Sequence, residues 1–263
     1  MPARTRIAGA NVAVRVARYL VGHIRRHSLA PGAPLPSEVE ASAELGVSRG
    51  IVREVYRSLS TAGIVETANG RRPRVSRISN RVLTQLLQHA LSTRQVSAQD
   101  MLELRRPIEL LAAELAATKR TDDDVMSLRR TVAAMKATGL RREAFVQADI
   151  RFHEIIGRAT GNPLFGLIVS ALRESMELSV RIGIRSPRAD FQQVVKTHQE
   201  IVDAIERAQP ERARSLMALH FDEARANVLR AELNQAEASA AARPRKARAS
   251  AARVRPEPRR RQA

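Results

Sequence analysis

The chain has 263 residues, enough for one large or two small domains, and 44% of them are apolar, which is sufficient to build a buried core. It contains no cysteine, which excludes disulfides, thiolate zinc sites and cysteine nucleophiles and leaves His, Asp and Glu as metal ligands. No apolar run approaches the roughly 20 residues that cross a bilayer. We therefore expect a cytoplasmic protein.

The formal charge of +18 is concentrated at the two ends of the chain. Residues 1–77 hold 13 Lys and Arg against 5 Asp and Glu, and residues 236–263 hold 9 against 2. Basic clusters gain affinity for phosphates by displacing condensed counterions, so the expected partner is a polyanion, nucleic acid before membrane. Association with the nucleoid would follow, and solubility alone is the other explanation for the charge.

The first 78 residues are predicted to form three helices and a hairpin. Apolar residues recur at helical spacing up to Ile24, and the prolines of LAPGAPLP end that helix near Ser28. Ser37 followed by Glu40 is a capping box, which predicts a short helix to about Leu45. A third helix should begin after the N-cap Ser48, with a buried stripe formed by Ile51, Val52, Val55, Tyr56 and Leu59.

Residues 63–76, GIVETANGRRPRVS, predict two short strands around a turn at Asn69-Gly70. The third helix would present Arg49, Gly50 and Arg53 at its first turns, where the positive end of the helix dipole adds to their charge. This is the arrangement of a helix-turn-helix that reads guanine edges in the major groove. Arg71, Arg72 and Arg74 would flank it, and the alternative is a small domain with a solvated basic face.

This region resembles the winged helix-turn-helix of GntR-type bacterial transcription regulators over roughly residues 11–77. The shared features are Leu-Pro-Ser-Glu at 35–38, Leu-Gly-Val-Ser-Arg at 45–49, Arg53-Glu54, Leu59 and Gly63. The resemblance implies contacts to a double-stranded operator from Ser48, Arg49 and Arg53 on the recognition helix, and from Gly70 and Arg71 on the wing. With the exposed neighbours, the predicted DNA-binding set is Ser48, Arg49, Gly50, Arg53, Gly70, Arg71 and Arg72.

Residues from about 80 to 235 are predicted to form an all-α antiparallel bundle of six or seven helices. The expected breaks lie at 92–97, 118–124, Gly139, 161–163, 186–187 and Pro210. The division is a DNA-binding domain over 8–78, a connecting helix over 79–96 and a helical domain over 97–233. Residues 234–263, rich in Ala, Arg and Pro, are expected to form a disordered basic tail. The fold class is thus mainly α.

Asp149 and His153 are four positions apart in a helical pattern and so share one face. His198 lies 12 residues before the break at Gln209-Pro210 and His220 lies 10 residues after it. At 1.5 Å per residue these distances correspond to roughly 18 and 15 Å, so an antiparallel pair would bring both rings to a similar height. A third helix carrying Asp149 and His153 could complete an Asp-His-His-His set for Zn, Ni, Mn or Fe. Each histidine taken alone could also be an ordinary core or surface residue.

The second region resembles the FCD effector domain of the FadR subfamily over about residues 97–230. The motifs are LELRRPIELLAAELAA at 102–117, DIRFHEIIGRATGNPLF at 149–165, and His198 and His220. The resemblance implies that Asp149, His153, His198 and His220 bind a divalent cation, zinc before the others. It also implies that Arg105 meets an effector carboxylate and that Asn162 lines the same cavity. Arg105 could equally form an ion pair with Glu109 at i+4.

Together these features predict a homodimeric repressor that binds an inverted repeat and responds to a small organic acid near the metal, with no catalytic residues. Two other functions stay open at this point. The ligand set also suits a metal-dependent oxygenase or hydrolase, and the basic ends suit an architectural protein that binds DNA without sequence preference.

Overall fold

The computed structural model describes residues 3–137, 142–183 and 191–241. The chain divides into two compact units, which are described separately below. One contains residues 1–96 and 167–174, and the other contains residues 97–166 and 175–263. No helix among the described residues is both long enough and apolar enough to cross a membrane.

The first unit begins with three helices, α1 (Ala3–Arg26), α2 (Glu38–Leu45) and α3 (Arg49–Thr61). The predicted capping box of α2 is present, because the Ser37 hydroxyl accepts from the Glu40 N–H and the Glu40 carboxylate accepts from the Ser37 N–H. Ser48 caps α3 through its hydroxyl alone, which accepts from the N–H of Ile51. The three helices and the strands share a core of Val16, Leu20, Leu35, Ala41, Val52, Val55, Tyr56, Leu59, Val65 and Val75.

The predicted hairpin is formed by β1 (Val65–Glu66) and β2 (Arg74–Val75), paired antiparallel. The loop between them spans residues 67–73, longer than the two-residue turn expected at Asn69-Gly70. Pro73 has no N–H to continue the ladder. Its carbonyl instead accepts from Leu35, and β2 pairs on its other edge with residues 32–35. The wing is therefore held by a segment far from it in the sequence.

Two further segments belong to the first unit. The helix α4 (Arg81–Ser92) has no buried residue. Its preceding residue Asn80 donates a hydrogen bond of 3.0 Å from its side chain to the hydroxyl of Ser170. Ser170 lies in α8 (Pro163–Ala171). Residues 167–171 of this helix belong to the first unit and residues 163–166 to the second.

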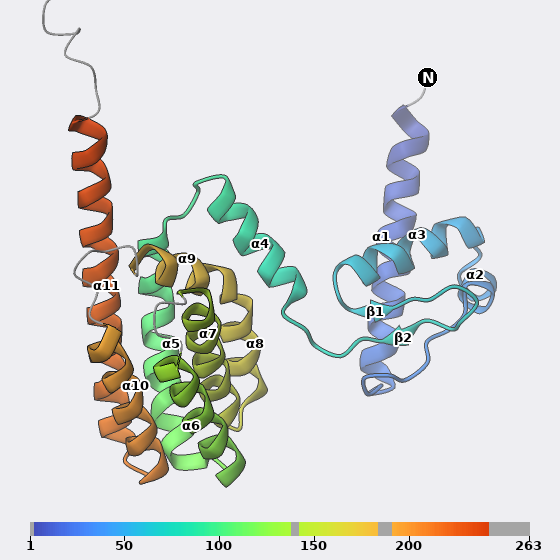
Figure 1. The fold of residues 1–263 in the computed structure, drawn as a ribbon. Helices are drawn as coiled ribbons and strands as arrows, with labels where there is room; N and C mark the ends of the chain where they lie inside the picture. The colour runs from blue at the N-terminus through green and yellow to red at the C-terminus, as the bar shows by residue number, and fades with distance from the viewer. Residues whose placement is uncertain (1–2, 138–141, 184–190, 242–263) are drawn as a thin grey trace, which may run out of the picture. The chain divides into compact units, whose positions relative to one another are not determined.

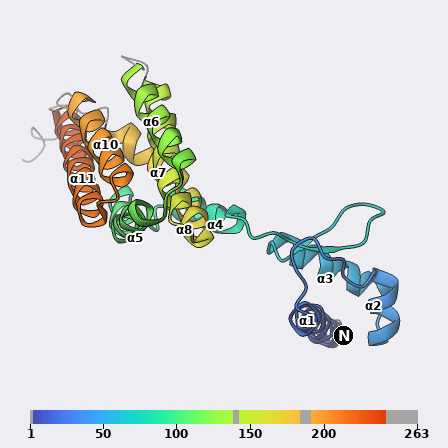
Figure 2. The ribbon, with the colours of Figure 1, turned by 90° about the horizontal axis from the view of Figure 1, so that it is seen from below.

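The second unit is a helical bundle (Figures 1 and 2). Its long helices are α5 (Ala98–Lys119), α6 (Asp122–Ala137), α7 (Arg142–Ala159), α10 (Phe191–Glu206) and α11 (Pro210–Ala241). The helix α5 packs on α7, α10 and α11, and α6 packs on α7 and α10. Most of α9 (Arg173–Gly183) also belongs to this unit.

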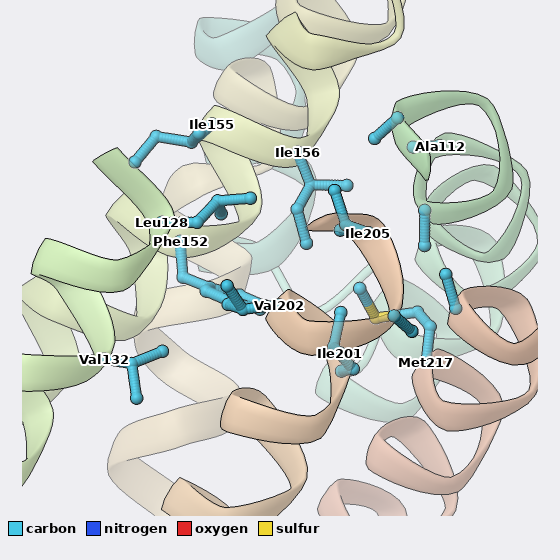
Figure 3. Packing of buried hydrophobic residues seen from close by; sticks show 14 of the residues in the cluster. Ala112, Leu128, Val132, Phe152, Ile155, Ile156, Ile201, Val202, Ile205 and Met217 are labelled. Atoms are coloured by element: carbon cyan, nitrogen blue, oxygen red, sulfur yellow. The ribbon is translucent and has the colours of Figure 1, made fainter. Parts of the chain in front are cut away.

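Apolar side chains from these helices interdigitate in one core (Figure 3). On α7 the fully buried positions Phe152, Ile155 and Ile156 follow helical spacing and belong to the same core as Ile201 and Ile205 of α10. The stripe that buries these residues also carries His153 inward, since position 153 lies on the same face.

The breaks expected from the sequence at 92–97, 118–124, 161–163 and Pro210 are present. Those at Gly139 and 186–187 lie outside the described residues. An interruption at Leu172, between α8 and α9, was not expected; its N–H is shared between the carbonyls of Ile168 and Val169. In addition, α11 continues to Ala241, whereas the tail was expected to begin at residue 234. The sequence there is rich in alanine, the strongest helix former.

Leu128→Ala should destabilise the bundle by about 2–5 kcal/mol, because it removes a fully buried side chain and leaves a cavity. Met126→Ala, on the same helix but 50% exposed, is the matched control and should change stability little. Chemical unfolding followed by circular dichroism measures both. Equal unfolding midpoints for the two variants would contradict the assigned core.

Candidate metal centre and DNA-binding surface

Four buried polar side chains from three helices meet inside the bundle. Asp149 and His153 lie one turn apart on α7, His198 lies on α10 and His220 on α11. One potential ligand atom from each lies within 4.8 Å of the others, and no residue of the four is more than 8% exposed. The structure therefore brings together all four of the predicted ligands. We call them the donor cluster.

The turn between α10 and α11 sets the heights of two of these residues. Ala208 adopts a left-handed conformation, and the N–H of Gln209 bonds to the carbonyl of Ala204, which reverses the chain before Pro210 begins α11. The two helices pack against each other. As a result the ring centroids of His198 and His220 are 4.6 Å apart.

Two rings of the donor cluster have one nitrogen engaged and the other near Asp149. Nδ1 of His198 lies 2.7 Å from the Val194 carbonyl, and Nε2 lies 3.0 Å from Oδ1 of Asp149. Nε2 of His153 lies 3.9 Å from Oδ2 of Asp149, and its Nδ1 contacts the carboxylate of Glu109. A nitrogen with its proton directed to an acceptor leaves the other with a free lone pair.

The electrostatics favour an anionic carboxylate and a neutral imidazole at two of the four positions. Burial alone raises the pKa of Asp149, but His198, His153 and His220 together lower it well below its usual range. Burial, followed by the neighbouring rings of His198 and His153, holds the pKa of His220 well below its usual value. These are the protonation states in which both groups ligate metals.

The donor cluster fits a divalent metal. Among the described residues, five buried side-chain polar atoms lack a well-formed hydrogen bond, and four of them lie in or beside the donor cluster: Oε2 of Glu109, Nδ1 and Nε2 of His153, and Nε2 of His198. Oε2 of Glu109 and Nδ1 of His153 contact each other, so the atoms that indicate a missing partner are the two Nε2 atoms that face Asp149. Three imidazoles and one carboxylate suit Zn, Ni, Mn or Fe.

Arg105 and Asn162, the two predicted effector contacts, lie in different environments. Arg105 is 3% exposed and donates from Nε to Glu109 at 2.8 Å, the ion pair that the sequence left open as an alternative. Its guanidinium carbon lies 5.2 Å from the centroid of the Phe221 ring. Asn162 is exposed, and its side chain accepts from the N–H of Leu164 near the start of α8. Its part in an effector site stays a prediction.

The predicted DNA-binding residues lie on the first unit. Between α3 and the wing is a groove of about 610 Å³. Arg49, Gly50 and Gly70 are exposed, and Gly70 has the left-handed φ of 71° that a turn of this kind requires. The groove is lined by Ser37, Glu38, Arg49, Arg53, Tyr56, Arg57, Thr67, Ala68, Asn69, Gly70, Arg71, Arg72 and Pro73.

Two carboxylates hold arginines in this groove. Arg53 donates to both oxygens of Glu38 at 2.9–3.1 Å, and Arg72 pairs with Glu40. The Arg53 hydrogen bonds lower the pKa of Glu38. Sequence reasoning did not include these acidic partners. It also omitted Arg57, which lies four residues after Arg53 on the same helix face and could have been found from that spacing.

The chain is similar to known transcription regulators over most of its length. The family described as "Bacterial regulatory proteins, gntR family" matches residues 12–75, and the FCD domain matches residues 100–223. The galactonate operon transcriptional repressor of Escherichia coli (strain K12) is 32% identical over 184 residues, which are 66% of this chain and 78% of the relative. The chain belongs to the GntR family.

A further relative and a solved structure support this family assignment. The transcriptional repressor NanR of Cronobacter sakazakii is 30% identical over 215 residues, 76% of this chain and 78% of that protein. The solved structure titled "Streptococcus agalactiae GntR" has a TM-score of 0.61 and 25% identity, and covers 81% of this chain and 98% of its own. The family consists of DNA-binding transcription regulators and not of enzymes, which removes the metalloenzyme alternative.

Without metal, the stability of this GntR-family protein should fall as the pH drops below about 6.5, the ordinary pKa of histidine. His220 stays neutral in the folded state, whereas in the unfolded chain it takes up a proton near that pH. The unfolded state then binds more protons and is favoured by up to about 1.4 kcal/mol per pH unit. Asp149 is ionised in both states over this range, so its lowered pKa affects stability only at more acidic pH.

Chemical unfolding in the presence of a chelator at pH 7.5 and pH 5.5 tests this for the wild type and His220→Gln. The variant should lose less stability than the wild type on acidification. The same loss in both proteins would contradict a neutral, buried His220.

Proposed function

We propose that this GntR-family protein is a repressor whose affinity for its operator is controlled by a small organic acid bound beside a divalent metal ion. The observation that carries the proposal is the donor cluster, in which Asp149, His153, His198 and His220 converge in the interior of the bundle. Four ionisable side chains at one buried point are costly to fold unless a partner compensates them.

The first unit supplies the DNA contacts. Arg49 and Arg53 at the first turns of α3 reach base edges in the major groove, while Arg71 and Arg72 of the wing contact phosphate or the minor groove. Ser48 contacts DNA from the start of α3, and Gly50 and Gly70, which have no side chains, allow the backbone to approach closely. Two such modules in a homodimer would recognise an inverted repeat.

The second unit binds the effector. A divalent ion held by the donor cluster would supply an electrophilic centre for carboxylate or hydroxyl oxygens. Asp149 provides the anionic ligand, and the Val194 carbonyl holds the ring of His198 so that Nε2 points inward. Arg105 uses Nε for Glu109, and its terminal nitrogens are offered to the carboxylate of the effector. We place Asn162 in the same binding region only on the basis of the sequence pattern.

Binding is coupled to the helices because the ligating side chains come from α7, α10 and α11. An effector that favours one arrangement of these helices shifts the population toward it. A coupling of about 1–3 kcal/mol changes operator affinity 5- to 150-fold. The E. coli relative is named for the galactonate operon, and a hydroxy acid of that kind has the oxygens that this site would bind. In this proposal the protein represses transcription while it is bound to the operator, and effector binding releases it from the DNA.

Arg49→Ala should weaken binding to the preferred DNA site by about 1–3 kcal/mol, the loss expected for one base-contacting arginine. The site is first selected from a random duplex pool with the wild type, and affinity is then measured by fluorescence anisotropy at fixed salt. Arg18→Ala, an exposed arginine on α1 outside the groove, is the control and should bind nearly as the wild type does. Equal affinity for selected and random DNA would instead indicate an architectural protein.

The purified protein should contain about one divalent metal per chain, and His153→Ala should contain much less, because a ligand is lost. Elemental analysis measures the metal. A thermal-shift screen of carboxylic and hydroxy acids should then find an acid that stabilises the metal-loaded wild type and weakens its binding to the selected DNA. A metal-free wild type that takes up no metal, or an effector that binds His153→Ala equally well, would contradict the proposal.

A further inference from the structure

A buried chain of charged side chains leads from α5 to the donor cluster. Arg105 and Glu109 are one turn apart on α5, and Glu109 reaches across to His153 on α7. Their exposed fractions are 3%, 1% and 1%. Neither the FCD match nor the names of the relatives assigns a role to Glu109, and the donor cluster does not include it.

The two oxygens of Glu109 are used differently. Oε1 accepts from Nε of Arg105 at 2.8 Å, and Oε2 contacts Nδ1 of His153. The carboxylate thus lies between a guanidinium and an imidazole, and both neighbours favour its anionic form. A carboxylate buried without such a partner would be strongly destabilising. Arg105 therefore makes it possible to keep an anion beside His153.

The contact determines which nitrogen of His153 is available. An anion at Nδ1 favours the tautomer with the proton on Nδ1, which leaves the lone pair of Nε2 directed toward Asp149. His198 is oriented by the same principle, but its Nδ1 faces the neutral carbonyl of Val194. A carboxylate partner makes an imidazole a stronger donor than a carbonyl does, so the two rings differ in their support.

We infer that Glu109 is a positioning residue for the metal centre, which fixes the ring and tautomer of His153, and that the first task of Arg105 is to hold Glu109 in place. This inference rests on the proposed metal site. Arg105 then has two roles. Its Nε holds Glu109, which supports the metal ligand His153, and its terminal nitrogens are offered to the effector. An effector that draws Arg105 away from Glu109 would change how Glu109 holds the ring and tautomer of His153. Effector binding would therefore change the affinity for the metal through this contact.

The test compares Zn(II) affinity of the full-length protein at pH 7.5, measured by competition with a fluorescent chelator. Glu109→Gln should bind Zn(II) about 10- to 100-fold more weakly than the wild type, the usual effect of losing a partner of a metal-bound histidine. Glu114→Gln is the matched control: it lies on the same helix, and its ion pair with Arg214 is exposed, so Zn(II) affinity should not change.

Because Glu109→Gln leaves Arg105 buried without its partner, the double variant Arg105→Gln/Glu109→Gln is measured as well. It removes both charges at once and should fold as the wild type does without metal, yet bind Zn(II) as weakly as the single variant. Long-range proton–nitrogen spectra of protein labelled at its six histidines report the tautomer, and His153→Gln assigns the signal. The wild type should show the proton of His153 on Nδ1, and both Glu109 variants should show that form reduced.

The outcomes separate the two claims. Wild-type Zn(II) binding with unchanged affinity and tautomer in both Glu109 variants would overturn the role of Glu109 and leave the metal site intact. A wild type that binds no Zn(II) would overturn the zinc site of the proposed function, and the inference with it.

Discussion

Placing ionisable groups inside an apolar bundle imposes the strictest constraint on this protein. Two carboxylates, Asp149 and Glu109, lie in the interior with one guanidinium and three imidazoles. None of these groups could be buried alone at acceptable cost, and each lies beside ionisable groups from another helix or another turn. The chemistry of the donor cluster therefore depends on the packing of α5, α7, α10 and α11, since moving one helix would separate a charged group from its neighbour of opposite charge.

The ion pairs of the DNA-binding surface follow a different logic. Arg53 with Glu38 and Arg72 with Glu40 are solvent-exposed, and exposed pairs contribute only about 0–1 kcal/mol. Such pairs orient an arginine without holding it firmly, so the side chain can exchange its carboxylate for a phosphate or a base edge at little cost. Ion pairs between arginine and glutamate thus have two uses. In the bundle the buried pair fixes the structure, and on the first unit the exposed pairs leave the arginines free to bind DNA instead.

Local signals in the sequence predicted most of the fold. The capping residues Ser37 and Ser48 and the break at Pro210 act through neighbouring backbone groups, so they can be recognised without tertiary structure. The convergence of His198 with His220 was also predictable, because helix rise and one turn determine it. The contact of Glu109 with His153 was not, since it depends on how α5 packs on α7. The seven-residue wing loop likewise depends on residues 32–35, which are distant in sequence, and the break at Leu172 has no glycine or proline to mark it.

The regular helix between the α10–α11 turn and His220 has a consequence for how sequences of this kind can vary. A residue inserted within α11 between Pro210 and His220 would rotate His220 by about 100° around the helix axis relative to the turn and shift it by about 1.5 Å. His220 would then leave the interior, although the helix itself could continue unbroken. Length between the turn and His220 is therefore as tightly restricted as the identity of the ligands, and an alignment gap inside α11 would separate chains that keep the centre from chains that have lost it.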